Sequence, residues 1–241
     1  MNIVHKVKSK LGLNKKQEDG FRSSKQISYS QTGEDLIVRF ILGQLNITQP
    51  KYLDLGAHHP DFLNNTNIFY QNGGSGVNVE PDPFLIQQFD KLRPNDINLN
   101  VGIGFRENEE LMDFFVMSDK VLNTFSKEEA EKIESYGTYK IEQVLQIKLI
   151  PISKVLSYFK AGLPNFVTLD VEGLDLQIIK TIDFESFRPQ VFCIETITYT
   201  EDKSERKITE IIDWMLSKDY FVYADTFINT IFVDKQAWLK R

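Results

Sequence analysis

Short apolar runs alternate with amphipathic stretches from Lys51 onward, and this alternation constrains the fold of the 241-residue chain more than any other feature. The runs that have the length and composition of buried strands cover residues 51–55, 75–79, 96–101, 166–171 and 190–195. The stretches with helical spacing lie near residues 62–71, 83–92, 174–181 and 204–218. Strands that alternate with helices form a mostly parallel sheet with helices on both faces. We therefore expect an α/β protein with a Rossmann-like, doubly wound sheet.

The two ends of this pattern differ from its middle. Tyr220–Ala224 and Phe227–Val233 are both strand-like, and the turn between them is too short for a parallel crossover, so they are expected to form an antiparallel hairpin. At the other end, Thr32 with Asp35 three residues later predicts a capped helix over about 33–44. We expect a single domain over residues 28–241, preceded by a basic segment and linker over residues 1–27.

Residues 105–150 interrupt the regular alternation. They contain the charged, helix-like segment Lys127–Ser135 and the strand-like segment Val144–Ile152. An insertion between core strands commonly contributes to a substrate site or lid. It is equally compatible with ordinary surface, and the sequence leaves both interpretations open.

Charge and composition exclude some partners. The net charge of −6 disfavours nucleic acid as the main partner. No apolar run approaches the length of a transmembrane helix, and the N-terminus lacks the apolar stretch of a secretory signal. The only cysteine, Cys193, lies in an apolar run and has no partner for an intramolecular disulfide, so a cytoplasmic location is expected. Residues 1–16 carry five lysines and an apolar stripe, which predicts either a weak membrane-surface contact or a solvated terminal helix.

The candidate binding site lies where the predicted strands end. Ligands of open parallel sheets bind beyond the carboxyl ends of the strands, and the first strand ends at Asp54 and Gly56. Glu80 ends the second strand 24 residues after Gly56, close to the spacing at which an acid meets a ribose. Its two oxygens suit two neighbouring hydroxyls. Asp82 is as consistent with a helix N-cap as with a ligand contact.

The turn after the first strand separates two classes of ligand. A dinucleotide needs the pattern G-x-G-x-x-G, whereas here Gly56 is followed by Ala57, His58 and His59. A pyrophosphate would meet side chains where it requires bare backbone. S-adenosylmethionine has no pyrophosphate, so the turn favours this cofactor over NAD.

Further acids follow the later strands. Asp170 and Glu172 end the strand over 166–171 and share one side of the chain, and Glu195 ends the next strand. Asp170, Glu172 and Glu195 are candidate ligands for Mn²⁺ or Mg²⁺, which prefer oxygen. The same cluster is a candidate source of a general base, for which we expect Glu172 or His59. Alternatively, Asp170 or Glu172 caps the helix that starts near Leu174.

The histidines of the turn allow two interpretations. His58 or His59 at the mouth of the crevice is a candidate general base or metal ligand, because imidazole titrates near neutral pH. Packing or hydrogen bonding beneath the ligand is the alternative. We place His59 with Asp170 and Glu172 in the expected catalytic set.

Together these stretches resemble the FkbM-type methyltransferases, S-adenosylmethionine-dependent O-methyltransferases that act largely on sugars and other polar natural products. The matching stretches are Ser30–Asp35, Tyr52–Pro60, Asn65-Thr66, Gly76–Pro81, Asn100–Ile103 and Leu169–Gly173. The chain differs from many members of this family at His58-His59-Pro60, where those members carry a smaller turn.

The resemblance implies a seven-stranded sheet and roles for particular residues. It places Asp54 and Gly56 at the methionine end of the cofactor, Glu80 at the ribose and Asn100-Val101 near the adenine. It brings Gln31 in from the N-terminal helix, and turns Asp170 and Glu172 toward the methyl group and the acceptor. The full expected cofactor-binding set is Gln31, Asp54, Gly56, Ala57, His58, Glu80, Asp82, Asn100 and Val101.

The expected function is transfer of a methyl group to a hydroxyl of a polar acceptor, namely a sugar, a sugar nucleotide or a capsule or glycan precursor. Two alternatives remain, an NAD-dependent oxidoreductase on a similar sheet and a non-catalytic binding protein of the same fold. Neither the acceptor nor the oligomeric state follows from the sequence.

Overall fold

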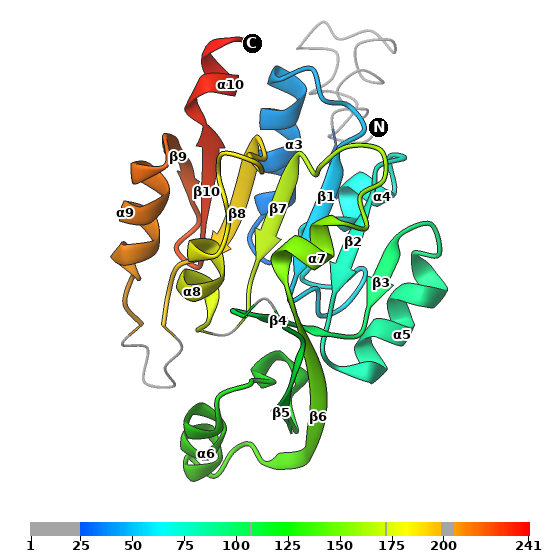
Figure 1. Ribbon diagram of the computed structural model, residues 1–241, viewed down its shortest axis with the longest axis vertical. Helices are drawn as coiled ribbons and strands as arrows, with labels where there is room; N and C mark the ends of the chain where they lie inside the picture. The colour runs from blue at the N-terminus through cyan, green and yellow to red at the C-terminus, as the bar shows by residue number, and fades with distance from the viewer. Residues whose placement is uncertain (1–24, 107, 172, 199–204) are drawn as a thin grey trace, which may run out of the picture.

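A computed structural model of the chain describes residues 25–106, 108–171, 173–198 and 205–241. Seven strands form one sheet in the order β3–β2–β1–β7–β8–β10–β9 (Figure 1). They are β1 (Lys51–Leu55), β2 (Ser75–Val79), β3 (Ile97–Leu99), β7 (Phe166–Leu169), β8 (Val191–Glu195), β9 (Tyr220–Asp225) and β10 (Asn229–Asp234). Neighbouring strands run parallel except at β10, which runs antiparallel to both β8 and β9. The predicted sheet and its C-terminal hairpin are confirmed.

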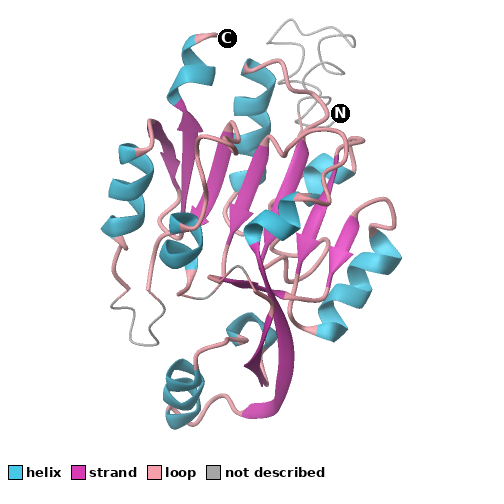
Figure 2. Ribbon diagram, in the orientation of Figure 1, coloured by secondary structure: helices cyan, strands magenta, loops and turns pink. Residues whose placement is uncertain are grey.

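Helices cover both faces of this sheet (Figure 2). They are α3 (Glu34–Gln44), α4 (Asn67–Tyr70), α5 (Pro83–Leu92), α7 (Ile152–Leu156), α8 (Asp175–Lys180), α9 (Thr209–Ser217) and α10 (Lys235–Leu239). Alternate residues of β1 face opposite layers: Leu53 and Leu55 pack in the cluster with α7, α8 and α9, while Tyr52 packs with α3 and α4. Burial on both faces explains why the core strands read as continuous apolar runs.

The insertion, together with the residues just before and after it, forms a second, smaller sheet beyond the carboxyl ends of the parallel strands (Figure 1). Its strands are β4 (Gly102–Gly104), β5 (Glu110–Met117) and β6 (Ile141–Pro151), in the order β4–β6–β5. The 3₁₀ helix η1 (Lys120–Leu122) and helix α6 (Lys127–Ser135) connect β5 to β6. The predicted helix has the bounds of α6, and the predicted strand Val144–Ile152 lies almost wholly within β6.

Three predicted helix starts differ from the structure, and one of them is the helix expected near 204–218, which begins at Thr209. Thr32 does not cap α3: the N-cap residue is Gly33, at φ 97°, and the Thr32 hydroxyl donates to Glu34 instead. The helix expected over 62–71 is only Asn67–Tyr70, because Asn64 accepts hydrogen bonds from the backbone N–H groups of Thr66 and Asn67 and thereby delays the helix start. Side-chain bonds of this kind compete with helix formation.

The basic segment over residues 1–16 lies outside the described residues. Among the residues that the structure does describe, no helix has the length and apolar character needed to cross a membrane. The extent of the domain, residues 28–241, remains a proposal.

Candidate functional site

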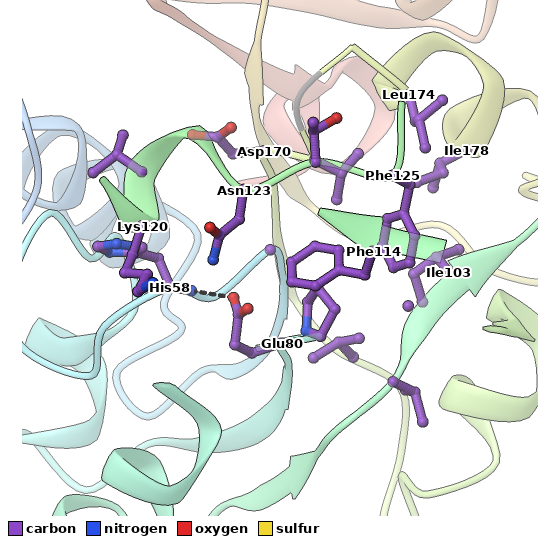
Figure 3. Close-up of a pocket in the computed structure, with 18 of the residues that line it drawn as sticks. His58, Glu80, Ile103, Phe114, Lys120, Asn123, Phe125, Asp170, Leu174 and Ile178 are labelled. Atoms are coloured by element: carbon purple, nitrogen blue, oxygen red, sulfur yellow. Dashed lines mark hydrogen bonds between the residues drawn. The ribbon is translucent and has the colours of Figure 1, made fainter. Parts of the chain in front are cut away.

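A pocket opens where the carboxyl ends of β1, β2 and β7 meet the small sheet (Figure 3). The strand order reverses between β1 and β7, and at such a point open parallel sheets bind ligands. The pocket contains about 970 Å³ of empty space when its open mouth is counted. Among its lining residues are Gln31, Gly56, His58, Glu80, Val101 and Asp170, all singled out by the sequence.

The turn after β1 requires a glycine. Gly56 has φ 78°, and a Cβ atom there would lie 1.7 Å from the backbone oxygen of Asp170. The backbone N–H groups of Gly56 and Ala57 both donate to the Val79 carbonyl, at 3.0 and 3.1 Å. Gly56 thus lets the ends of β1, β2 and β7 approach one another, and it leaves bare backbone at the pocket floor.

Glu80 is a buried carboxyl that lines the pocket. Its Oε2 accepts the backbone N–H of His58 at 2.8 Å, and its Oε1 accepts the backbone N–H of Asp82 at 2.7 Å. Burial raises the pKa of Glu80 to about 8, although these two hydrogen bonds oppose the shift. Each oxygen is therefore fixed in place and retains capacity to accept a further hydrogen bond.

Asp82 and Asn100 support Glu80 and do not line the pocket. Asp82 is the N-cap of α5, and its Oδ1 accepts the backbone N–H of Phe84 at 2.8 Å. Asn100 donates from Nδ2 to the carbonyl oxygens of Glu80 and Pro81, at 3.0 and 2.8 Å. Both residues hold the β2 end in place, while the neighbouring Val101 lines the pocket.

Asp54 lies under the turn, within a buried polar network. Its Oδ2 accepts the Thr66 hydroxyl at 2.7 Å and the Asn64 amide at 3.2 Å. Arg93 donates to Thr66 at 2.8 Å, to the Asn64 carbonyl oxygen at 2.6 Å and to the Pro60 backbone oxygen at 2.6 Å. This network fixes the turn from below. The sequence gives no sign of it, because arginine is usually exposed and a single arginine after a helix is not a motif.

Asp170 enters the pocket from the end of β7. Its backbone N–H donates to the Leu55 carbonyl at 3.0 Å, which places it beside the β1 turn. Burial, together with the negative charges of Asp175 and Asp54, raises the pKa of Asp170 to about 7. A carboxyl with a pKa near neutrality is suited to accept a proton from a reacting group.

Asp170 does not cap α8. The residue that fastens the start of this helix is Asp175, whose Oδ1 accepts the backbone N–H of Val171 at 3.2 Å. Burial raises the pKa of Asp175 to about 6.

The two histidines occupy different surroundings. The His58 side chain lines the pocket near Lys120, and its backbone has φ 51°. Burial, with the neighbouring His59 as a second cause, lowers the pKa of His58. His59 is not among the lining residues: its Nδ1 lies 2.9 Å from an Asp61 oxygen, and its ring packs edge-on against Phe62. The pocket geometry therefore favours His58 over His59 for contact with a ligand.

Gln31 reaches the pocket from a segment held by α3. The buried Asp35 accepts the Tyr29 backbone N–H at 2.7 Å and the Ser28 and Ser30 hydroxyls at 2.6 and 3.0 Å. The Tyr29 carbonyl accepts the backbone N–H of Asn64 at 2.9 Å. These bonds attach the segment before α3 to the loop after β1, and they explain the Ser-x-Ser-Gln pattern around Gln31.

The insertion supplies one wall of the pocket. Phe114 of β5 and Phe125 lie with ring centroids 4.8 Å apart, and both line the pocket together with Asn123. The Phe125 ring occupies the space where a Cβ of Gly102 would stand, 2.6 Å from its tip. The sequence did not single out these residues, because only the tertiary fold brings them to the strand ends. Whether the insertion acts on a substrate remains a prediction.

The expected metal ligands do not form a described cluster. Glu172 lies outside the described residues, and Glu195 ends β8 opposite Asn229 of β10. Within the ranges that the structure describes, no group of three or more His, Cys, Asp or Glu residues is arranged to hold a metal ion. These residues give no support to the expected Mn²⁺ or Mg²⁺ site.

The sequence of this chain matches a known protein family. The family model of the methyltransferase FkbM domain matches residues 54–222. No curated protein matches the chain.

Several solved structures resemble the fold. Methyltransferase FkbM from Methylobacillus flagellatus KT is 15% identical with a TM-score of 0.45, and the match covers 77% of this chain and 44% of that one. Monomeric WbdD is 11% identical with a TM-score of 0.45, covering 88% and 42%. A TehB-like SAM-dependent methyltransferase from Corynebacterium glutamicum ATCC 13032 Kitasato is 8% identical with a TM-score of 0.42, covering 97% and 100%. The chain thus spans less than half the length of the first two structures.

Proposed function

Because the chain belongs to the FkbM family of methyltransferase domains, we propose that it is an S-adenosylmethionine-dependent O-methyltransferase. Membership confirms the resemblance seen in the motifs. In this proposal the acceptor is a hydroxyl of a sugar, a sugar nucleotide or a precursor of a capsule or other glycan. The observation that carries the proposal is Glu80, a buried carboxyl at the end of β2 that is held by two backbone N–H groups beside an open pocket.

The pocket residues suit the parts of this cofactor. Glu80 would accept hydrogen bonds from the two ribose hydroxyls, because each of its oxygens can accept one more hydrogen bond. Gly56 would allow the chain to approach the methionine portion, with Gln31 near its polar end. Val101, Phe114 and Phe125 would contact the adenine ring. Apolar lining with a few placed polar groups is typical of such sites.

Asp170 is the proposed general base. Bound S-adenosylmethionine supplies a methyl group that is already activated as a sulfonium, so the protein has to align the acceptor and remove its proton. Methyl transfer would join the acceptor oxygen to the methyl carbon, break the carbon–sulfur bond and leave its electron pair on sulfur. The hydroxyl proton passes to the Asp170 carboxylate. The products are the methyl ether and S-adenosylhomocysteine.

In this proposal Asp170 acts as the base without a metal ion. An assay with and without EDTA tests this point. Loss of activity with the chelator, followed by recovery with Mn²⁺ or Mg²⁺, would add a metal to the mechanism.

Binding and turnover experiments test the function. Calorimetry should detect S-adenosylhomocysteine and not NADH, because His58 and His59 stand where a pyrophosphate needs glycine. Mass spectrometry of S-adenosylmethionine incubated with a panel of hydroxylated acceptors should then find a methylated product. Binding of NADH alone would contradict the proposal in favour of an oxidoreductase. Binding of S-adenosylhomocysteine without any methylated product would favour a non-catalytic binding protein.

A further inference from the structure

The side chain of Asn123 connects the insertion to the strand end that carries Glu80. Asn123 follows η1 and faces the pocket (Figure 3). Its Nδ2 donates to Asp82 Oδ2 at 3.0 Å, and its Oδ1 accepts the backbone N–H of Met117 at 2.8 Å. One amide therefore joins the N-cap of α5 to the last residue of β5.

The core side of this connection is rigid. Asp82 is completely buried, and its Oδ1 already caps α5. Its backbone N–H holds Oε1 of Glu80 at 2.7 Å. A shift of Asn123 relative to Asp82 is therefore a shift relative to Glu80.

The insertion side is rigid as well. Phe115 and Thr124 exchange two backbone hydrogen bonds, of 2.8 and 3.2 Å, which fasten the segment after Asn123 to β5. We call Phe114 and Phe125, whose rings pack on each other, the aromatic wall. Asn123 and the aromatic wall thus belong to one rigid unit of the insertion.

From this geometry we propose that Asn123 is a positioning residue for the nucleoside part of the cofactor. Its hydrogen bond to Asp82 sets the separation between the aromatic wall and the Glu80 carboxyl, so that a purine and its ribose fit between them. The inference rests on the proposed function, because it takes S-adenosylmethionine as the ligand.

Calorimetry on the full chain with two probes tests the inference. The probes are S-adenosylhomocysteine and 5′-methylthioadenosine, which lacks the amino-acid portion. Asn123→Ala should lower the affinity for both probes by the same factor, about tenfold, as expected for loss of a hydrogen bond to a carboxyl group. Gln31→Ala should weaken S-adenosylhomocysteine more than 5′-methylthioadenosine, because Gln31 is placed near the other end. Gln143→Ala, on the exposed part of β6, serves as the control and should change neither.

A reciprocal exchange provides the sharper test. Asn123→Asp brings two carboxyls together and should weaken binding more than Asn123→Ala. Asp82→Asn alone leaves two amides facing each other. The double variant Asp82→Asn, Asn123→Asp restores a donor and an acceptor while asparagine still caps α5, so binding should return toward that of the wild type.

Three results would overturn the assignment. One is unchanged affinity of Asn123→Ala for both probes, even with a lowered melting temperature, since that describes a purely structural residue. Another is a double variant whose affinity for the probes is no higher than that of the single variant with the lower affinity. The third is loss of S-adenosylhomocysteine binding with 5′-methylthioadenosine binding intact. Failure of the wild type itself to bind S-adenosylhomocysteine would instead contradict the proposed function, and with it this role.

Discussion

At the scale of the residue, two acids in one pocket have different environments. Glu80 is held by the backbone N–H groups of His58 and Asp82, whereas within the described part of the chain no side chain donates to Asp170. Burial is the largest cause of the raised pKa in both, to about 8 for Glu80 and about 7 for Asp170. The held carboxyl suits binding, and the freer one suits proton transfer.

Cofactor binding should depend on pH through Glu80. Ribose hydroxyls donate to the ionised carboxylate, which is the minor form at neutral pH when the pKa is about 8. The affinity for S-adenosylhomocysteine should therefore rise with pH and level off above about 8. Glu80→Gln should lower the affinity about tenfold or more and lose this component of the pH dependence. Glu210→Gln, in the exposed first turn of α9, is the matched control, and calorimetry across the pH range is the measurement.

Asp170 should affect turnover more than cofactor binding. Asp170→Asn removes the proposed base without changing side-chain size, so the rate should fall about 10²- to 10⁴-fold. The affinity for S-adenosylhomocysteine should change little. The wild-type rate at saturating substrates should rise with pH through about 7, the pKa of Asp170. A variant that keeps the wild-type rate would exclude Asp170 as the base.

At the scale of the element, the loop from β1 to α4 is shaped by side chains from other segments. Arg93, at the end of α5, bonds to Pro60, Asn64 and Thr66 and lies 3.8 Å from a carboxylate oxygen of Asp96. Asp96 in turn accepts the Tyr52 hydroxyl at 2.7 Å. The loop conformation thus depends on α5 and β1 together.

Loss of Arg93 should destabilise the protein strongly. Arg93→Met leaves the acids of the network without their buried cation, which typically costs about 3–5 kcal/mol. Arg106→Met is the control, because the Arg106 side chain is 79% exposed and pairs with Glu110 on the surface, where such pairs contribute about 0–1 kcal/mol. Urea denaturation monitored by circular dichroism gives both values. An equal decrease in the free energy of unfolding for both variants would show that the buried network stabilises the protein no more than the surface pair does.

At the scale of the whole molecule, several raised carboxyl pKa values couple stability to pH. The pKa values of Glu80, Asp170 and Asp175 are about 8, 7 and 6, above the ordinary values of 4.5 and 3.8. At a pH between the ordinary and the raised pKa values, the folded state therefore binds more protons than the unfolded state. These groups therefore reduce stability as pH rises through that window.

The melting temperature of the free protein should accordingly fall by several degrees between about pH 5 and pH 8. Scanning calorimetry at a series of pH values measures it. A variant with Glu80→Gln and Asp170→Asn should show a smaller decline, since it lacks two of the titrating groups. A decline of the same size in the variant would assign the effect to other residues.

The sequence by itself determined the features that depend on local spacing. Strands buried on both faces require continuous apolar runs, so β1, β2, β7 and β8 were predicted nearly to the residue, as was α6 from its own periodicity. Gly56 and Glu80 were identified because they stand directly after two predicted strands, where a strand–turn–helix unit places its ligand-binding residues. The family resemblance followed from the order of such short motifs.

Only the tertiary structure decided which side chains share the pocket. Phe114, Asn123 and Phe125 reach it because the small sheet folds back over the strand ends, and His58 faces it while His59 turns to Asp61. Asp54 lies beneath the turn because Asn64, Thr66 and Arg93 form hydrogen bonds that no local pattern encodes. Local spacing fixes the backbone period of each element, whereas the direction of a side chain depends on partners that are distant in the sequence.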